Sequence, residues 1–354
     1  MQILIIRLIL TVAIGIAGAV VAEKLHFPAP WMLGSLIGVA VFSVLTDFSY
    51  MPSWVKVATQ TIAGAFVGCR FTRKNIKTLY HLIVPAIIQL SLMLISCIAI
   101  GTLVYKISDF DYITSALSTS PGGIVDTTLI GLDLGANTAV ISLLHTVRLT
   151  CAVSIFPAIM IKIVKKLGMM PEPEELEEEK TEEKKNRWEP KWLAIAFGVA
   201  AIGGAIGKIT GVPAGVLTFS MVSVALLNIF TGKVVLPPGF RKGAQVFSGA
   251  LIGTGISMAM ILQLKSIVLP VIVLIVGFFF MNLMIALILH KLFKIDMLSA
   301  FFASTPGGVT DLALMIDELG GRPSIVSILQ ISRLMTAIAV YPTLVILANR
   351  FFGG

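Results

Sequence analysis

Two segments of the sequence combine the residue types that build a polar ligand site inside an apolar protein. Residues 115–135 read SALSTSPGGIVDTTLIGLDLG, and residues 299–320 read SAFFASTPGGVTDLALMIDELG. In each segment a proline, which lacks an N–H, and two glycines interrupt a helix-forming apolar stretch. A broken backbone within a bilayer survives only where protein or a wet cavity satisfies its polar groups. The helix that restarts after the glycines points free N–H groups at that cavity, which suits a polar or anionic ligand.

Charged residues follow both breaks at the same spacing. Asp126 and Asp311 come three residues after the Gly-Gly pair, in the first turn of the restarted helix, where each could cap N–H groups, bind a cation or take up a proton. Arg148 and Arg333 lie in the following apolar stretch, where an unpaired charge costs at least about 3 kcal/mol. We therefore expect each arginine to pair with one of these aspartates or with an anionic substrate. The alternative is purely structural, with each aspartate a helix cap and each arginine its counter-ion.

The candidate ligand site therefore contains two matching sets of residues. The predicted substrate- or ion-binding residues are Ser120, Pro121, Gly122, Gly123, Asp126, Arg148, Thr305, Pro306, Gly307, Gly308, Asp311 and Arg333. Secondary candidates are Gln60, Gln245, Asp133, Glu318 and His145. We expect no metal site and no cofactor, because the three cysteines and four histidines are scattered without ligand spacing.

The secondary candidates have plainer explanations. His145 precedes Arg148 by three residues, but Gln330 stands at the matching place, which excludes a strict twofold role. A hydrogen-bonding core histidine is favoured over a proton relay. Gln60 and Gln245 each precede a Gly-xxx-Gly pattern, whose glycines predict close helix packing, while the glutamines could reach a substrate.

A single offset of 185 residues relates the two segments and their surroundings. It superimposes Pro121 on Pro306, Asp126 on Asp311 and Arg148 on Arg333, without a gap. We interpret the chain as a duplication, with membrane repeats at 1–167 and 192–354. The connecting segment 168–191 contains nine of the 19 acidic residues and is expected to be a solvated linker.

Composition places both repeats in a membrane. The chain is 56% hydrophobic and 13% charged, whereas soluble domains are about 25% charged. Ten apolar stretches are candidate helices: 2–22, 28–46, 54–71, 78–105, 137–161, 192–207, 212–231, 243–262, 266–290 and 323–348. The predicted fold is an all-α polytopic membrane protein, with about five spanning helices and one broken PGG helix or hairpin in each repeat.

Positive charge favours an inverted arrangement of the repeats. If each PGG segment crosses the membrane fully, the repeats are parallel and the cluster from Arg70 to Lys77 lies outside. If each enters and returns, the repeats are inverted, and this cluster lies in the cytoplasm with those near 162–166, 233–242 and 291–294. The second arrangement also places the linker in the cytoplasm.

The duplicated unit resembles the AbrB duplication-domain family of bacterial membrane proteins, as distinct from the soluble DNA-binding regulator of that name. The resemblance rests on [ST]-P-G-G-[IV]-x-D, a following L-G-[AG] and an arginine in the next helix, in both copies. Family labels include ammonia monooxygenase and regulator of gene expression. The chain has no metal cluster, no dinucleotide fingerprint and no basic soluble region that would support those labels. The break is also similar to that of bile-acid/sodium symporter-like carriers.

These observations predict a secondary transporter in the inner (plasma) membrane, and not an enzyme. It would move a small polar or anionic solute by alternating access, with coupling to protons preferred over sodium. The alternative is a membrane-embedded sensor that affects gene expression, and a monooxygenase is a more distant third. The expected partners are the lipid bilayer and the solute, and no nucleic acid. The sequence leaves the substrate, the direction of transport and the oligomeric state open.

Overall fold

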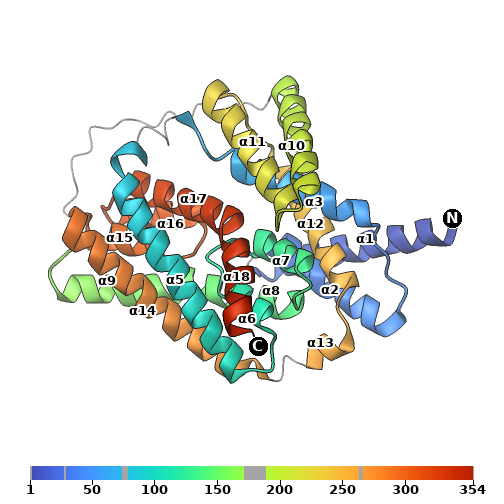
Figure 1. Cartoon of the computed structure of the whole chain (residues 1–354), viewed down its shortest axis with the longest axis horizontal. Coiled ribbons are helices and arrows are strands. Elements are labelled where there is room, and N and C mark those ends of the chain that lie inside the picture. Colours follow the sequence, from blue (N-terminus) through green and yellow to red (C-terminus); the bar gives the residue numbers. More distant parts are fainter. Residues whose placement is uncertain (1, 28, 74–78, 171–188, 263–265, 354) are drawn as a thin grey trace.

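The computed structural model describes residues 2–27, 29–73, 79–170, 189–262 and 266–353. Every regular element in these ranges is a helix, which confirms the predicted all-α class (Figure 1). Most of the linker, 171–188, lies outside the described residues, as do Lys74 and Lys77 of the first basic cluster.

The first repeat forms three helices, then a long helix, two half-helices and a final long segment. In order these are α1 (Gln2–Lys24), α2 (Pro30–Thr46), α3 (Ser53–Gly68), α5 (Ile83–Ile107), α6 (Tyr112–Ser118), α7 (Ile124–Asp133), α8 (Thr138–Thr150), the π-helical turn η1 (Cys151–Ile155) and α9 (Phe156–Lys166). The last three are continuous and form one apolar segment of 29 residues.

The second repeat follows the same order. Its helices are α10 (Pro190–Thr210), α11 (Gly215–Thr231), α12 (Pro238–Thr254), α13 (Met258–Leu262), α14 (Val268–Phe293), α15 (Met297–Ser304), α16 (Val309–Glu318), α17 (Pro323–Ala339) and α18 (Tyr341–Phe352). Two expectations need correction. Stretch 243–262 is two helices, because α12 ends at Thr254, and stretch 323–348 bends by 51° between α17 and α18.

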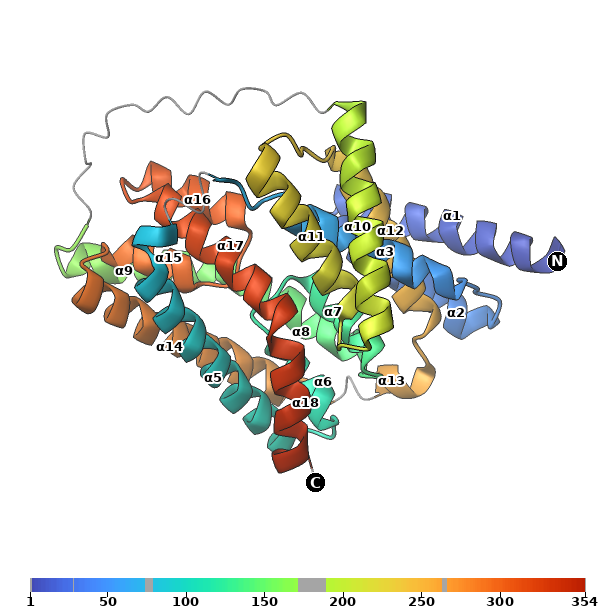
Figure 2. The same cartoon turned by 45° about the horizontal axis from the view of Figure 1, so that its top comes forward.

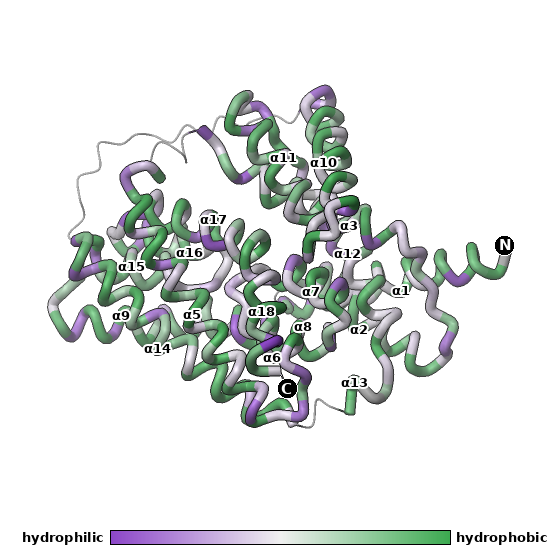
Figure 3. Tube along the Cα trace, viewed as in Figure 1, coloured by the Kyte–Doolittle hydropathy of each residue, from purple (hydrophilic) through white to green (hydrophobic). Residues whose placement is uncertain are grey.

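Helix lengths support a multi-pass membrane protein. Five helical segments are long and apolar enough to cross a bilayer, or six if the bent pair α17–α18 is one span. The expectation of about ten full spans is therefore met only in part, since α2, α3, α11 and α12 have 16 or 17 residues. In Figure 3 hydrophobic colour runs along most of the helices, and hydrophilic residues gather mainly in the connecting segments.

Small residues bring helices of the two repeats together. A Cβ at Gly64 of α3 would lie 2.5 Å from the Leu217 carbonyl oxygen of α11. At the matching place, a Cβ at Gly249 of α12 would lie 2.3 Å from the Met32 carbonyl oxygen of α2. The predicted close packing at these glycines is confirmed, and it joins each repeat to the other.

The long helices α5 and α14 pack against one another and around the half-helices. The largest apolar cluster contains Met93 and Cys97 of α5 and Phe278 and Ile285 of α14, all buried. The half-helices α6 and α15 contribute Leu117 and other buried residues to it. Both breaks thus lie against the protein interior.

Candidate functional site

The predicted breaks are present in both repeats. Helix α6 ends at Ser118 and α7 begins at Ile124, while α15 ends at Ser304 and α16 begins at Val309. Gly123 and Gly308 are the N-caps of the restarted helices, so free N–H groups begin where the sequence predicted. The structure therefore confirms the interruption at each Pro-Gly-Gly.

Each first half-helix is fixed at its start by an aspartate. Asp111 Oδ1 accepts from the Thr114 N–H at 2.8 Å, and Asp296 Oδ1 accepts from the Ser299 N–H at 2.7 Å. These are N-cap hydrogen bonds, worth typically about 1 kcal/mol each.

The end of each first half-helix is tied to the neighbouring long helix. The Thr119 hydroxyl donates to the Cys97 carbonyl of α5 at 2.8 Å. The Ser304 hydroxyl donates to the Asn282 carbonyl of α14 at 3.2 Å. Both pairs are related by the 185-residue offset, so the duplication extends to individual contacts at the breaks.

Arg148 closes the first break with its guanidinium group. It donates to the carbonyl oxygens of Ser120 and Gly122, the latter at 2.8 Å, and lies 5.3 Å from the centre of the Phe278 ring. The side chain is only 2% exposed. We expected a carboxylate or an anion as its partner, whereas these contacts show it satisfying carbonyls that the broken helix leaves unpaired.

Arg333 is held far less completely at the second break. Its Nη2 lies 3.5 Å from the Gly307 carbonyl oxygen. Within the described part of the chain, its Nε and Nη1 have no hydrogen-bond acceptor, although the residue is only 3% exposed. Buried charged donors without acceptors are costly and uncommon in folded proteins. Arg333 can therefore still donate hydrogen bonds from Nε and Nη1 to an acceptor.

His145 is a buried, hydrogen-bonded core residue. Its Nδ1 lies 3.2 Å from Arg148 Nη2, which can only donate, so Nε2 bears the proton and donates to the Leu117 carbonyl at 2.9 Å. Gln330 Nε2 donates to the matching Phe302 carbonyl at 2.8 Å. The two side chains therefore share a structural hydrogen bond to matching carbonyls, Leu117 one residue before the end of α6 and Phe302 two residues before the end of α15.

A cavity of about 260 Å³ lies between the two breaks and is lined by both repeats. The predicted residues that line it are Gly122, Gly123, Asp126, Arg148, Gln245, Pro306, Gly307, Gly308 and Arg333. Ser120, Pro121 and Thr305 are buried and are not among the lining residues. Asp311 belongs to α16, and its side chain lies outside the described residues.

Sequence reasoning missed other residues of the cavity wall. Arg70 lines it, although its charge was used only to predict orientation, and Phe66 and Val67 of α3 add apolar surface. Their spacing from Ala63, which also lines the cavity, was the available signal, since residues at i, i+3, i+4 and i+7 share a helix face.

Asp126 folds back over the start of its own helix. A Cβ at Gly123 would lie 2.7 Å from Asp126 Oδ2, so a side chain at position 123 would displace this carboxylate. The carboxylate is 8% exposed and faces the cavity. It is therefore positioned at the positive end of α7, as the sequence predicted.

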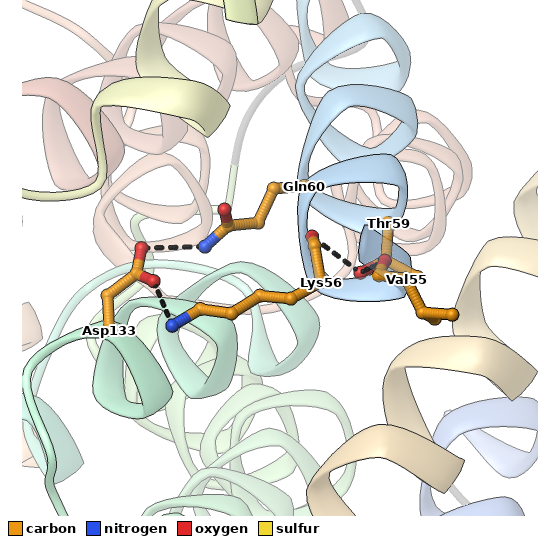
Figure 4. A network of polar contacts seen from close by, with 5 residues as sticks. All are labelled: Val55, Lys56, Thr59, Gln60 and Asp133. Carbon is orange, nitrogen blue, oxygen red and sulfur yellow. Dashed lines mark hydrogen bonds and ion pairs between the residues drawn. The ribbon is translucent and has the colours of Figure 1, made fainter. Parts of the chain in front are cut away.

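Three secondary candidates lie away from the central cavity. Gln60 and Asp133 contact each other beside Lys56, near a separate groove (Figure 4). Glu318 is exposed at the end of α16. Gln60 and Gln245 therefore have different surroundings, despite their matching positions.

Comparison with known proteins agrees with this duplicated architecture. A family model described as "Transition state regulatory protein AbrB" matches residues 1–165 and again residues 164–349. The chain belongs to the AbrB family. The paired matches cover both membrane repeats, as expected for the membrane proteins of this name.

Two relatives extend over nearly the whole AbrB-family chain. One, "Uncharacterized protein YhjN" of Bacillus subtilis (strain 168), is 24% identical over 365 residues, covering 97% of this chain and 93% of the relative. Another, "Putative regulator AbrB" of Escherichia coli (strain K12), is 23% identical over 327 residues and covers 90% of each chain. The resemblance predicted from the PGG motifs is thus confirmed. Among the described residues, no group of three histidine, cysteine or acidic side chains could hold a metal ion.

Proposed function

We propose that this AbrB-family protein is a secondary transporter of a small anionic solute. The observation that supports it most directly is Arg333, a buried guanidinium group at the cavity wall with two donor nitrogens that lack acceptors among the described residues. Guanidinium donors bind carboxylate or phosphate oxygens in paired, charge-assisted hydrogen bonds. A solute anion would supply the acceptors that the protein does not.

The rest of the cavity wall favours the same ligand class. Arg70 and Arg148 add positive charge, and Asp126 is the acidic lining residue. Phe66 and Leu334 contribute apolar surface. With a volume of about 260 Å³, the cavity suits a small carboxylate with an apolar body rather than a large polyanion.

Inverted repeats are a common basis of alternating access, and the course of two equivalent helices supports that arrangement. In Figures 1 and 2, α5 descends from the upper left, while α14 starts near the lower end of α5 and rises toward the upper left. Repeats of opposite orientation around a central site are typical of secondary transporters. In this arrangement the protein lies in the plasma membrane with its linker in the cytoplasm, and Asp126 and Asp311 couple transport to protons rather than to sodium.

A membrane-embedded sensor is the second candidate, because the Escherichia coli relative is described as a regulator. A sensor would bind the same anion in the same cavity without moving it. Neither proposal includes an enzymatic reaction.

The test is uptake of radiolabelled acetate, lactate, succinate and benzoate into proteoliposomes, paired with binding measured on the purified protein. A transporter accumulates one of these anions, and Arg333→Gln abolishes accumulation. Binding without accumulation would support the sensor. If the protein neither binds nor accumulates any of these anions, the proposed substrate class is wrong.

A further inference from the structure

A small polar network closes the space between α3 and the end of α7. Asp133, the last residue of α7, forms an ion pair with Lys56 at 2.5 Å and accepts a hydrogen bond from Gln60 at 2.6 Å (Figure 4). Lys56 and Gln60 are one turn apart on α3 and point toward the same carboxylate. The network thus holds α3 against the second half-helix of the first repeat.

The matching residues of the second repeat are arranged differently. The offset of 185 places Gln245 and Glu318 where the first repeat has Gln60 and Asp133. Gln245 lines the central cavity, while Gln60 does not. Glu318 is exposed, and no hydrogen bond or ion pair joins it to another described residue. In the first repeat the glutamine is therefore hydrogen-bonded to the acidic residue that ends the second half-helix, which we call the closed form. In the second repeat the matching residues are not bonded to one another, which we call the open form.

The physical properties of the closed form suit a contact that opens reversibly. The Lys56 and Asp133 side chains are 31% and 23% exposed, so solvent weakens their attraction. A groove of about 1030 Å³ lies beside the network and is lined by Lys56, Gln60 and Asp133 together with Lys208 and the connection between α10 and α11. Breaking the ion pair of this network should therefore cost little.

We propose that Gln60 and Gln245 alternate as ligands of the transported anion, each being withdrawn in turn by the carboxylate that ends α7 or α16. In the conformation described, Gln245 faces the solute and Asp133 holds Gln60. In the opposite conformation, Gln60 faces the solute and Glu318 holds Gln245. This inference rests on the proposed transport function. It adds to that function the glutamine and carboxylate side chains that exchange partners between the two conformations.

Two matched disulfides test the exchange. In a background without Cys69, Cys97 and Cys151, Gln60→Cys with Asp133→Cys fixes the conformation described, and Gln245→Cys with Glu318→Cys fixes the opposite one. The reporter is the reaction of one further thiol with a small hydrophilic methanethiosulfonate. Ala244→Cys reports on the second repeat, and Thr59→Cys, at the matching position, reports on the first.

The expected result is a reversal of reactivity. With the 60–133 disulfide, position 244 reacts at least about tenfold faster than position 59, and with the 245–318 disulfide the order is inverted. A 245–318 disulfide that does not form during oxidation with copper phenanthroline, or that leaves the order unchanged, overturns the proposal. As a second measurement, Asp133→Asn without any disulfide should raise the reactivity of position 59, and an unchanged rate in the folded variant also overturns it.

These outcomes are separable from those of the transport proposal, because the labelling needs no solute. Reversal without uptake of any anion would leave the exchange of glutamines intact and refute transport. Anion uptake with an unchanged labelling order would refute the exchange alone.

Discussion

His145 and Gln330 occupy matching positions in the two repeats, and each donates a hydrogen bond to a matching carbonyl oxygen in the last turn of its half-helix, that of Leu117 or of Phe302. An imidazole and an amide thus perform the same structural task at 2.9 and 2.8 Å. The task is local, since Pro306 cannot donate to the Phe302 carbonyl, and the Leu117 carbonyl has one backbone donor, the Ser120 N–H.

The first prediction follows from this equivalence. His145→Gln should keep both stability and uptake. His145→Leu removes one hydrogen bond to the Leu117 carbonyl, which keeps the Ser120 N–H, and should lose about 0.5–1.5 kcal/mol of unfolding free energy. Thermal unfolding in detergent and uptake in proteoliposomes measure the two effects. Loss of uptake by a stable His145→Gln variant would instead assign His145 to a proton relay.

Arg148 and Arg333 should differ in the unfolding free energy that is lost when each is replaced by glutamine. Arg148→Gln removes donors from the Ser120 and Gly122 carbonyls and should cost about 1–3 kcal/mol of stability for each carbonyl left unpaired. Arg333→Gln gives up one 3.5 Å contact to the Gly307 carbonyl and removes two buried donor nitrogens that have no acceptors among the described residues, so its unfolding free energy should stay the same or rise.

Anion binding should be weakened more by Arg333→Gln than by Arg148→Gln. Losing one charge-assisted contact of about 1.5–3 kcal/mol predicts roughly 10- to 100-fold weaker binding for Arg333→Gln. Equal loss of stability in both variants, with binding unchanged in Arg333→Gln, would mean that both arginines are structural.

The glycine contacts between repeats predict a third result. Gly64→Ala and Gly249→Ala each place a methyl group within 2.6 Å of a carbonyl oxygen, and overpacking of this kind costs about 1–3 kcal/mol. Gly198→Ala is the matched control, because nothing lies within 4 Å of a Cβ there. Its unfolding free energy should stay the same or rise by up to about 1 kcal/mol, owing to better helix propensity. The midpoint of thermal unfolding in detergent distinguishes the three, and equal midpoints would contradict the described packing.

The fourth prediction concerns the coupling ion. Asp126→Asn keeps the shape of the side chain but cannot ionise, so an inward proton gradient should no longer accelerate anion uptake. Uptake by the unmodified protein should not change when external sodium is replaced by potassium. Acceleration by a sodium gradient, retained in Asp126→Asn, would assign the coupling to sodium and remove this aspartate from it.

Local chemistry explains which parts of the molecule were predictable. The absence of an N–H in Pro121 and Pro306 and the freedom of the glycines beside them break a helix wherever the chain folds, so the positions of both breaks followed from the sequence. The apolar stretches and the 185-residue offset likewise predicted nearly every long helix and the duplication. Helix ends were less accurate, as at α12, because capping and loop contacts set them.

Tertiary packing decided what the sequence left open. The two repeats present the same residue types at matching positions, so sequence alone cannot distinguish Gln60 from Gln245 or Arg148 from Arg333. The structure separates them, because helices of one repeat pack against helices of the other and one member of each pair is bonded more completely. Arg148 finds two carbonyls and Gln60 finds Asp133, while Arg333 and Gln245 are left facing the cavity. The sequence by itself determined a duplicated, membrane-embedded pair of broken helices, and contacts between segments far apart in the chain decided which side chains remain available to a ligand.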